Sequence, residues 1–315
     1  MGIRIVSTGV YVPERVVTNS ESNHISPQIN DDNLKLFVGA GERHICSVHE
    51  TPTYMGIQAA KTAISNAKLD PQSIDTIICY TLIGDHEVPK DVYKIAAGIG
   101  CDGAMCWSID TACATFLSQL NCADALVKNG KKRILLINST NWVSRGFPDD
   151  NPLLPGDGAG AVLVEEILDG NLINCIEKSS AAQFDFIKLE SAQLTGKSEY
   201  FEFSNSPRII HRAISILPEI ANEVLAKNNI KKDEVDWTIT HQPGVPAILK
   251  WHELLEIPVE KNLNTFSLYG NMSAANIPVT LDHFLNNEKK IKSGDLVLMF
   301  TAGAGIHAAA ALYRF

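Results

Sequence analysis

The sequence predicts an α/β fold in which helices cover both sides of buried sheets. Apolar strand-like runs alternate with amphipathic helical segments along the whole chain, which is the pattern of layered α/β proteins. Residues 69–80 resemble residues 230–241, with a polar helix end, an acidic residue and an apolar strand in both. A buried strand, a glycine turn and a strand of small residues at 131–164 recur at 293–312. These repeats predict two copies of one β/α unit, because repeats of this size indicate a duplicated domain and not a solenoid.

The elements of the first half follow from the spacing of apolar residues. Alternating apolar residues predict a first strand that begins near Ile3 and ends at Pro13. Helical spacing after Thr51, an N-cap candidate, predicts a helix over 52–68. The same reasoning predicts strands at 74–82, 104–109, 132–138 and 159–164, and helices at 91–99 and 113–128.

The second half repeats this order of elements. It has predicted helices at 212–226 and 245–255, strands at 235–240 and 296–300, a helix of small residues after Asn271, and a last strand that follows a glycine turn. We place the boundary near Asp169-Gly170, so the two halves are residues 1–169 and 170–315.

Composition excludes several classes of protein. The chain has 315 residues, of which 45% are hydrophobic and 20% charged, so it is globular and not disordered. A net charge of −9 argues against nucleic-acid binding and, more weakly, against an anionic membrane surface. No run of 18 apolar residues predicts a membrane span, and the first residues do not resemble a signal peptide.

The seven cysteines are odd in number and irregularly spaced, and none form a CxxC pair. This pattern argues against a zinc site of the common kind and predicts no bound metal. It also predicts free thiols in a reducing compartment, so we expect a cytoplasmic protein.

Cys113 is the candidate nucleophile. It lies in the run SIDTACATFLSQL, between a predicted strand and a predicted helix. A cysteine at a helix start should have a lowered thiol pKa, and the backbone N–H groups there can stabilise an oxyanion. The small neighbours Ala112 and Ala114 leave room for an acyl chain. Local sequence alone favours the alternative, a buried structural cysteine.

Two further residues strengthen the hypothesis of a catalytic site. His241 ends a predicted strand, and Asn271 precedes a predicted helix of small residues. Both positions can line a site at the carboxyl edge of a sheet. Each has an ordinary alternative, since a strand-end histidine is often structural and asparagine is a common N-cap.

Taken in order, these motifs resemble the thiolase superfamily, and within it the β-ketoacyl-acyl-carrier-protein synthase III condensing enzymes. The matching segments are TACATF around Cys113, HQP at His241, GNMSAANIP from Gly270, GDGAGAVLV from Gly156, the C-terminal GAG with Arg314-Phe315, and the N-terminal TGVYVPERVVTN. The resemblance covers essentially the whole chain. It implies a five-layer αβαβα fold of duplicated halves and a homodimer, or a heterodimer with a homologue.

The resemblance also implies the roles of the site residues. Cys113 would accept the acyl group, and His241 and Asn271 would donate hydrogen bonds to the enolate of a malonyl-type extender. The backbone N–H groups of Cys113 and Ala304 would form the oxyanion hole. The substrates would be acyl-CoA or acyl-carrier-protein thioesters, and no metal or redox cofactor would be needed.

Several positions depart from the pattern of the fatty-acid members. Asn33 and Phe37 stand where those members carry a tryptophan and an arginine that hold coenzyme A, and Asp149 replaces a second arginine. Pro246 follows the histidine where an arginine of the carrier-protein patch is expected. Val88 stands where a phenylalanine that crosses the dimer closes the acyl pocket. These departures favour a specialised member acting in secondary metabolism, for example polyketide or alkylquinolone synthesis, with a larger acyl group.

Trp142 and Arg145 are candidates for contact with a pantetheine arm or a ring-bearing substrate, although they fit a loop over the site equally well. His86 and Glu87 are interpreted as polar loop residues, and His307 is given no role.

Other functions compete with decarboxylative condensation. One is transfer of the acyl group from Cys113 to an amine or hydroxyl, and another is initiation of fatty-acid synthesis. A third is an inactive partner subunit, against which the intact Cys113, His241 and Asn271 argue. Asn271 favours condensation over simple transfer, because a transferase has less need of a paired donor.

Overall fold

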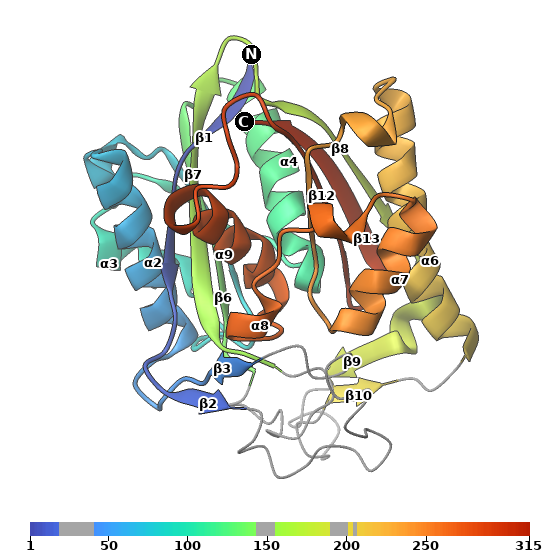
Figure 1. The fold of residues 1–315 in the computed structure, drawn as a ribbon. Coiled ribbons are helices and arrows are strands. Elements are labelled where there is room, and N and C mark those ends of the chain that lie inside the picture. Colours follow the sequence, from blue (N-terminus) through green and yellow to red (C-terminus); the bar gives the residue numbers. More distant parts are fainter. Residues whose placement is uncertain (19–40, 143–154, 190–200, 204–206) are drawn as a thin grey trace.

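Two sheets face each other across a central layer of helices in the computed structural model (Figure 1). The structure describes residues 1–18, 41–142, 155–189, 201–203 and 207–315. The two ends of the chain lie close together at one end of the molecule (Figure 1).

The five-stranded sheet comes from the first part of the chain. Its order is β1 (Gly2–Tyr11), β7 (Gly158–Ile167), β6 (Arg133–Thr140), β4 (Thr76–Thr81) and β5 (Met105–Ser108). β4 is parallel to β6 and β5, whereas β7 is antiparallel to β1 and β6. The parallel strands therefore end at one edge of the sheet, and Cys113 follows β5 at this edge.

The four-stranded sheet repeats this pattern. Its order is β11 (Trp237–Thr240), β12 (Leu296–Gly303), β13 (His307–Arg314) and β8 (Leu172–Ser179). β11 is parallel to β12, and β13 is antiparallel to both β12 and β8. These directions match those of β4, β6, β7 and β1. A parallel bridge between Thr238 and Asn262 stands where β5 pairs in the first sheet, so the predicted duplication is confirmed.

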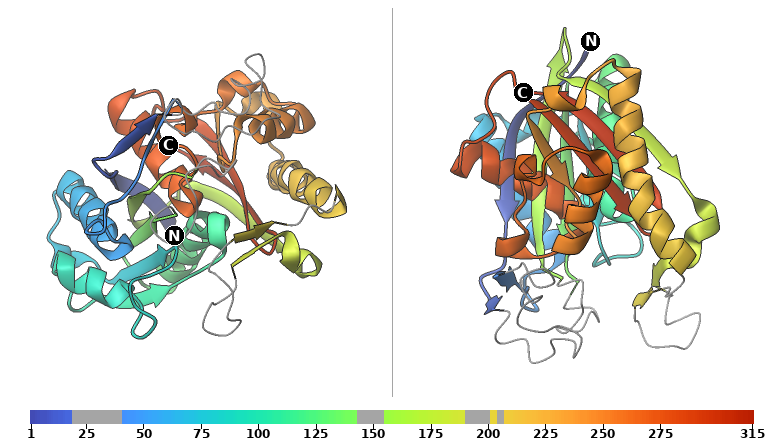
Figure 2. Two further views of the ribbon diagram at one scale, coloured as in Figure 1. Left: turned by 90° about the horizontal axis from the view of Figure 1, so that it is seen from below. Right: turned by 45° about the vertical axis from the view of Figure 1, so that its right-hand side comes forward.

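Helices fill three of the five layers. The outer pair on the five-stranded sheet is α2 (Pro52–Ala67) and α3 (Val92–Ile99), and the outer pair on the other sheet is α6 (Pro207–Lys227) and α7 (Val245–Leu255). The central layer holds α4 (Thr115–Lys128) and α9 (Asn276–Asp282), with the short α8 (Phe266–Tyr269) beside it. Figure 2 shows the outer helices on opposite sides of the molecule. The predicted five-layer αβαβα fold is therefore confirmed.

Separate apolar clusters join these layers. One lies in the central layer and includes Phe116, Leu120 and Leu281, all fully buried. A second packs α2 and α3 on the first sheet, and a third packs α6 and α7 on the second. Each fully buried side chain of this size contributes about 1.5–3 kcal/mol, so the central helices are fixed from both sides.

Most predicted elements are present, with shifted boundaries. Thr51 caps α2 as predicted, because its hydroxyl accepts the Tyr54 N–H at 3.3 Å. The helix predicted from Cys113 begins later, at Thr115. The sequence did not predict β8 or two small pairs of strands. These pairs are β2 (Val16–Thr18) with β3 (Glu42–His44), and β9 (Ile187–Leu189) with β10 (Phe201–Phe203). β8 lacks a clean alternation of buried and exposed residues, which is the signal that strand prediction needs.

Among the described residues, no helix is both long enough and apolar enough to cross a bilayer.

Candidate active site

Cys113 lies in a tight turn between the five-stranded sheet and a central helix. After β5, residues Ala112–Ala114 form one 3₁₀ turn, and α4 begins at Thr115. Asp110 Oδ1 accepts the Ala112 N–H at 2.8 Å and fixes the start of this turn. Ala112 has a left-handed φ of 52°, a conformation that costs about 1–2 kcal/mol for a residue with a Cβ. The strained residue thus directly precedes the nucleophile candidate.

Both halves of the chain hold Cys113. Its Sγ lies 3.2 Å from Ser273 Oγ, and its carbonyl oxygen accepts a hydrogen bond from Thr301 Oγ1 at 3.0 Å. Tyr80 is buried beside the same thiol, where its phenol interacts with Ser273. Burial raises the pKa of Tyr80 well above its usual value, so this phenol remains a neutral hydrogen-bonding group.

The surroundings of Cys113 overturn the expectation of a lowered thiol pKa. Although part of the residue is exposed, the protein packed around the sulfur raises the pKa of Cys113 to about 11. The Ser273 hydroxyl and a backbone N–H lower the pKa, but the Asp110 carboxylate raises it further. The expectation was wrong because burial outweighs the helix start, and α4 begins two residues after Cys113. The resting thiol is therefore protonated at neutral pH.

Asn271 is buried in the loop between α8 and α9, with 1% of its surface exposed. Its Oδ1 accepts the Ser273 N–H at 2.9 Å, which leaves the amide nitrogen to act as a donor. The GDGAG turn packs under this loop, since the Gly156 N–H donates to the Asn271 carbonyl at 3.0 Å. A Cβ on Gly156 would lie 1.8 Å from the carbonyl oxygen of Tyr269. Only glycine fits at position 156, and the close contact of the GDGAG turn with this loop helps to hold Asn271, the candidate donor, in place.

His241 follows β11, as predicted, and is buried. Its backbone N–H donates to the carbonyl of Phe300 on β12 at 3.2 Å. Burial lowers the pKa of His241 to about 4, although the nearby Asn276 side chain opposes this shift. Within the described part of the chain, His241 Nδ1 is buried without a hydrogen-bond partner. The ring is therefore neutral at physiological pH and has unused hydrogen-bonding capacity.

Segment 270–276 connects the predicted site residues. Ser273 contacts the Cys113 thiol and orients Asn271, and Asn276 interacts with His241. The Asn276 amide also donates to the carbonyl of Gly270 at 3.3 Å. One loop therefore brings a thiol, an amide donor and a neutral imidazole into a single network.

The turn that contains Ala304 lies against the turn that contains Cys113. A Cβ on Gly303 would lie 2.1 Å from the carbonyl oxygen of Thr111 and 3.0 Å from the Cys113 nitrogen. The two backbones therefore touch, and residue 303 must be glycine. Ala304 is the next residue, which places its turn beside the Cys113 N–H.

The other predicted site residues lie elsewhere in the fold or outside the described residues. Val88 is 90% exposed, on a loop that the buried Asp91 carboxylate anchors through His86 at 2.9 Å. Trp142 is buried just after β6. Arg145, Asn33, Phe37 and Asp149 lie outside the described residues. Pro246 lies in the first turn of α7.

His86 and Glu87 have different partners. Glu87 forms an exposed ion pair with Lys90 at 3.6 Å, whereas His86 contacts Asp91. The two side chains do not form an acid–base pair.

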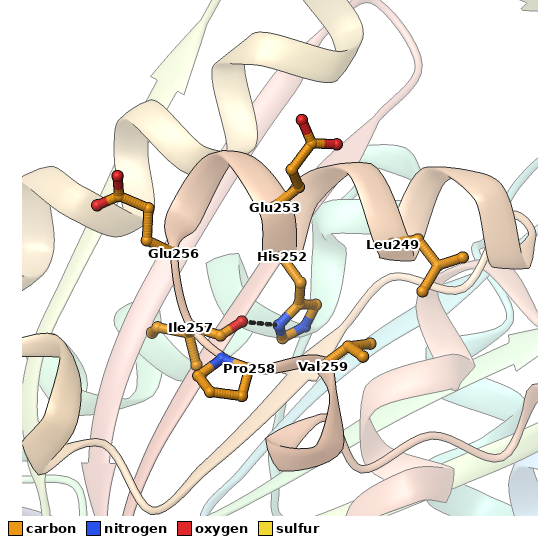
Figure 3. A pocket seen from close by; sticks show the side chains of 7 residues that line it. All are labelled: Leu249, His252, Glu253, Glu256, Ile257, Pro258 and Val259. Carbon is orange, nitrogen blue, oxygen red and sulfur yellow. Dashed lines mark hydrogen bonds between the residues drawn. The ribbon is translucent and has the colours of Figure 1, made fainter.

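Two surface pockets lie apart from this network. One of about 360 Å³ lies along α7 and is lined by Leu249, His252, Glu253, Glu256, Ile257, Pro258 and Val259 (Figure 3). His252 Nδ1 donates there to the Ile257 carbonyl at 3.0 Å, so this histidine fixes the helix end. The other, of about 610 Å³, is lined by Tyr11, Glu14, Arg15, Ser47, His49, Glu50 and Tyr54. Neither pocket includes Cys113, His241 or Asn271.

Sequence reasoning gave no role to Ser273, Thr301 or Tyr80. Ser273 stands in the quoted GNMSAANIP motif, and its proximity to Asn271 was the available signal. Tyr80 and Thr301 lie on strands far from Cys113 in the sequence, so no local motif indicates that they contact its turn. Among the described residues, no cluster of three or more histidine, cysteine or acidic side chains is arranged to hold a metal ion.

Sequence comparisons match the chain to a family and to several named relatives. The family described as 3-oxoacyl-[acyl-carrier-protein (ACP)] synthase III matches residues 108–180, and its C-terminal part matches residues 225–315. A β-ketoacyl-[acyl-carrier-protein] synthase III of Aquifex aeolicus is 34% identical over 318 residues. One from Pseudoalteromonas atlantica is 30% identical over 321 residues. Both alignments cover 100% of each chain.

Solved structures agree with these matches. The crystal structure of 3-oxoacyl-[acyl-carrier-protein] synthase III from Aquifex aeolicus has a TM-score of 0.90 and 32% identity, over 100% of both chains. The priming β-ketosynthase of the R1128 polyketide pathway has a TM-score of 0.89 and 22% identity, over 100% of this chain and 96% of its own. The second likeness shows the thiolase fold alone.

Proposed function

The chain belongs to the 3-oxoacyl-[acyl-carrier-protein] synthase III family of condensing enzymes, and from that premise we propose that Cys113 accepts an acyl group and condenses it with a second thioester. The supporting observation is the network in which segment 270–276 joins Cys113, Asn271 and His241. Residues 1–169 would then supply the nucleophile, and residues 170–315 would supply both donors.

In the first step, the Cys113 sulfur attacks the carbonyl of an acyl thioester. The C–S bond to the carrier breaks, and the departing thiolate takes up the proton that the Cys113 thiol has lost. Because the pKa of this thiol is about 11, the proton must leave as the attack proceeds. The N–H groups of Cys113 and Ala304 would stabilise the oxyanion, which typically contributes about 100- to 1000-fold in rate for each donor.

In the second step, a malonyl-type thioester loses carbon dioxide. The resulting enolate oxygen would accept hydrogen bonds from the Asn271 amide and the His241 ring. A neutral imidazole suits this role because it donates without leaving a buried positive charge, and burial keeps the pKa of His241 at about 4. The enolate carbon then attacks the acyl-Cys113 carbonyl. A carbon–carbon bond forms, the Cys113 thiolate leaves, and the thiol recovers a proton.

We further propose a specialised acyl substrate and a role in secondary metabolism. The support is chemical: Asn33, Phe37 and Asp149 would not hold a nucleotide phosphate as arginine does, and Asp149 would repel one. Pro246 likewise offers no charge to an acidic carrier protein. A small Val88 would admit a medium-chain, branched or aromatic acyl group. The donor, on coenzyme A or a carrier protein, would then be recognised mainly through its acyl group and pantetheine arm, with Trp142 and Arg145 as candidate contacts.

Two other activities remain as outcomes of the test. The named relatives are β-ketoacyl synthases III, which favours fatty-acid initiation with an acetyl donor. Transfer of the acyl group to an amine or hydroxyl would form no enolate and would therefore not need the buried Asn271 amide as a hydrogen-bond donor. We propose a homodimer, or a heterodimer with a homologue, without a metal or redox cofactor.

Intact-protein mass spectrometry after incubation with a panel of acyl thioesters tests the proposal. We expect a single acyl adduct on Cys113, formed faster from an octanoyl than from an acetyl donor. A malonyl thioester should then remove the adduct as a β-keto product. Efficient acetyl-coenzyme A turnover with an inert octanoyl donor would instead support fatty-acid initiation.

A further inference from the structure

A hydrogen-bonded network lies behind the Cys113 turn and is separate from the reacting groups. His307 Nε2 at the start of β13 donates to Glu177 Oε2 on β8 at 2.8 Å, and the two side chains are 19% and 20% exposed. Ser118 on α4 donates to the same oxygen at 2.5 Å, and Asn121 donates to Glu177 Oε1 at 2.7 Å. One carboxylate thus joins two strands of the second sheet to the helix that follows the nucleophile.

The network reaches the Cys113 turn through Ser118. The Ser118 and Thr111 hydroxyl oxygens lie 2.9 Å apart, and Thr111 stands just before the strained Ala112. Thr115 extends the connection, because its hydroxyl accepts the Thr111 N–H at 2.9 Å and donates to the Ala112 carbonyl at 2.7 Å. The backbone that presents Cys113 is therefore tied to α4 by side-chain hydrogen bonds.

The network reaches the Ala304 turn through His307. Residue 307 pairs with Gly303 and closes the hairpin between β12 and β13. The His307 ring is also fixed on its other side, because Nδ1 lies 2.8 Å from Ser179 Oγ. Both ring nitrogens are therefore held by β8, at the residue where the turn that contains Ala304 ends.

The charge of Glu177 supports this arrangement. Burial alone would raise the pKa of the Glu177 carboxyl, but hydrogen bonds from His307, Ser118 and Asn121 lower it below its usual value. The group is therefore a carboxylate at neutral pH and accepts hydrogen bonds from all three donors.

We propose that Glu177 and His307 are positioning residues that hold the Cys113 turn and the Ala304 turn at the separation which an oxyanion requires. The proposal rests on the function proposed above for these two turns. The turns meet at Gly303, and the Thr301 hydroxyl donates to the Cys113 carbonyl, so the contacts of the strands and helix that flank the turns help to set their separation. Misplacement by about 1 Å at a reacting centre can cost on the order of 100-fold in rate.

The test compares two substitutions of His307. In His307→Gln, the amide can still donate to Glu177, whereas His307→Leu removes the donor. We expect the leucine variant to acylate Cys113 about 10- to 100-fold more slowly, with KM for the octanoyl donor unchanged, because only the reacting geometry is affected. The glutamine variant should recover most of the rate. Glu223→Gln is the matched control, since it breaks the exposed pair with Lys178, a neighbour of Glu177 on β8.

Hydrogen exchange provides a readout that does not depend on activity. The amides of residues 110–115 and 302–306 should exchange about tenfold faster in His307→Leu than in the wild type or the control. The positioning role is refuted if His307→Gln and His307→Leu reduce the acylation rate equally. It is also refuted if hydrogen exchange at these amides is the same in His307→Leu as in the wild type. If the wild-type protein forms no adduct with any thioester, the proposed function fails. The exchange result alone then decides whether the network holds the two turns.

Discussion

The turn before α4 and the turn before α9 share one backbone design but carry different chemistry. Each is a single 3₁₀ turn that leads into a central helix, Ala112–Ala114 in the first half and Ser273–Ala275 in the second. Each begins with a left-handed residue, at φ 52° in the first and 49° in the second. The duplication thus reproduced a locally strained backbone on both sides of the site.

The side chains around these turns differ. Asp110 Oδ1 accepts the first N–H of its turn at 2.8 Å, and Asn271 Oδ1 does the same at 2.9 Å. Asp110 is exposed and anionic, whereas Asn271 is buried and keeps an amide N–H₂ to donate. The second residue is Cys113 in one turn and Ala274 in the other. The comparison teaches that one backbone conformation can present either a thiol or an amide, depending on two side chains.

Cys113→Ala should have the largest effect, because it gives the first turn the alanine of the second. We expect complete loss of both the acyl adduct and turnover, since no other thiol lies in the network. Mass spectrometry with an octanoyl donor measures the adduct. Cys106→Ala and Cys122→Ala serve as controls and should acylate normally. An adduct that persists in Cys113→Ala would mean that the two turns do not differ in the proposed way.

Asn271→Asp makes the two turns alike at their first acceptor. The carboxylate can still accept the Ser273 N–H, so the turn should keep its shape while the donor is lost. We expect normal self-acylation but a rate of malonyl decarboxylation lower by about 100- to 1000-fold. Carbon dioxide release, measured separately from adduct formation, distinguishes the two half-reactions. Wild-type decarboxylation by this variant would favour simple acyl transfer.

His241 differs from Cys113 in the direction of its pKa shift. Burial lowers the pKa of His241 from 6.5 to about 4, so the folded protein keeps the ring neutral while the unfolded chain binds a proton below pH 6.5. The contribution of the neutral His241 ring to the free energy of unfolding is therefore fully present above pH 6.5 and is lost as the pH falls toward 4. The loss is about 2–3 kcal/mol between pH 7.5 and 4.5.

Urea denaturation at both pH values measures this loss. In His241→Gln the dependence on pH should be weaker by about that amount, since glutamine does not titrate. An identical pH dependence in the variant and the wild type would show that His241 is not buried as described.

Asp110→Asn should have the smallest effect and makes the first turn resemble the second. The asparagine oxygen can still accept the Ala112 N–H, but the carboxylate that raises the pKa of Cys113 is removed. The pKa of Cys113 should therefore fall, and the thiolate fraction at pH 8 should rise modestly. We expect alkylation of Cys113 by iodoacetamide to become a few times faster. A slower reaction would reverse the assigned sign of the Asp110 contribution.

Local signals in the sequence predicted most strands and helices, whereas the five layers and the grouping of Cys113, His241 and Asn271 came from the resemblance of the ordered motifs to a family. Buried strands such as β4 and β6 are continuous apolar runs, and α2 has both a cap and helical spacing. The two strained turns were not predicted, since Ala112 and Ser273 are not residue types that signal a left-handed φ. Their conformation comes from hydrogen bonds and packing between distant elements.

The pKa of Cys113 and the Glu177–His307 contact show the limit of sequence reasoning more directly. A helix start is visible in the sequence, but the burial that outweighs it comes from segment 270–276 and β4, far away along the chain. Glu177 and His307 are separated by 130 positions. Glu177 lies on β8, which was not predicted, and His307 lies on β13, which was. Without the register of β8 against β13, nothing pairs them.

The glycines at 156 and 303 have a consequence for the evolution of this enzyme. A Cβ at either position would lie about 2 Å or less from a carbonyl oxygen, that of Tyr269 or Thr111. Because backbone meets backbone there, any larger side chain at either position would have to displace a segment that carries a candidate site residue. New substrate ranges would then have to arise in other segments, and the exposed loop with Val88 is our candidate for one. The backbone around the candidate catalytic residues is thus expected to vary little, whereas the residues that select the acyl group can change.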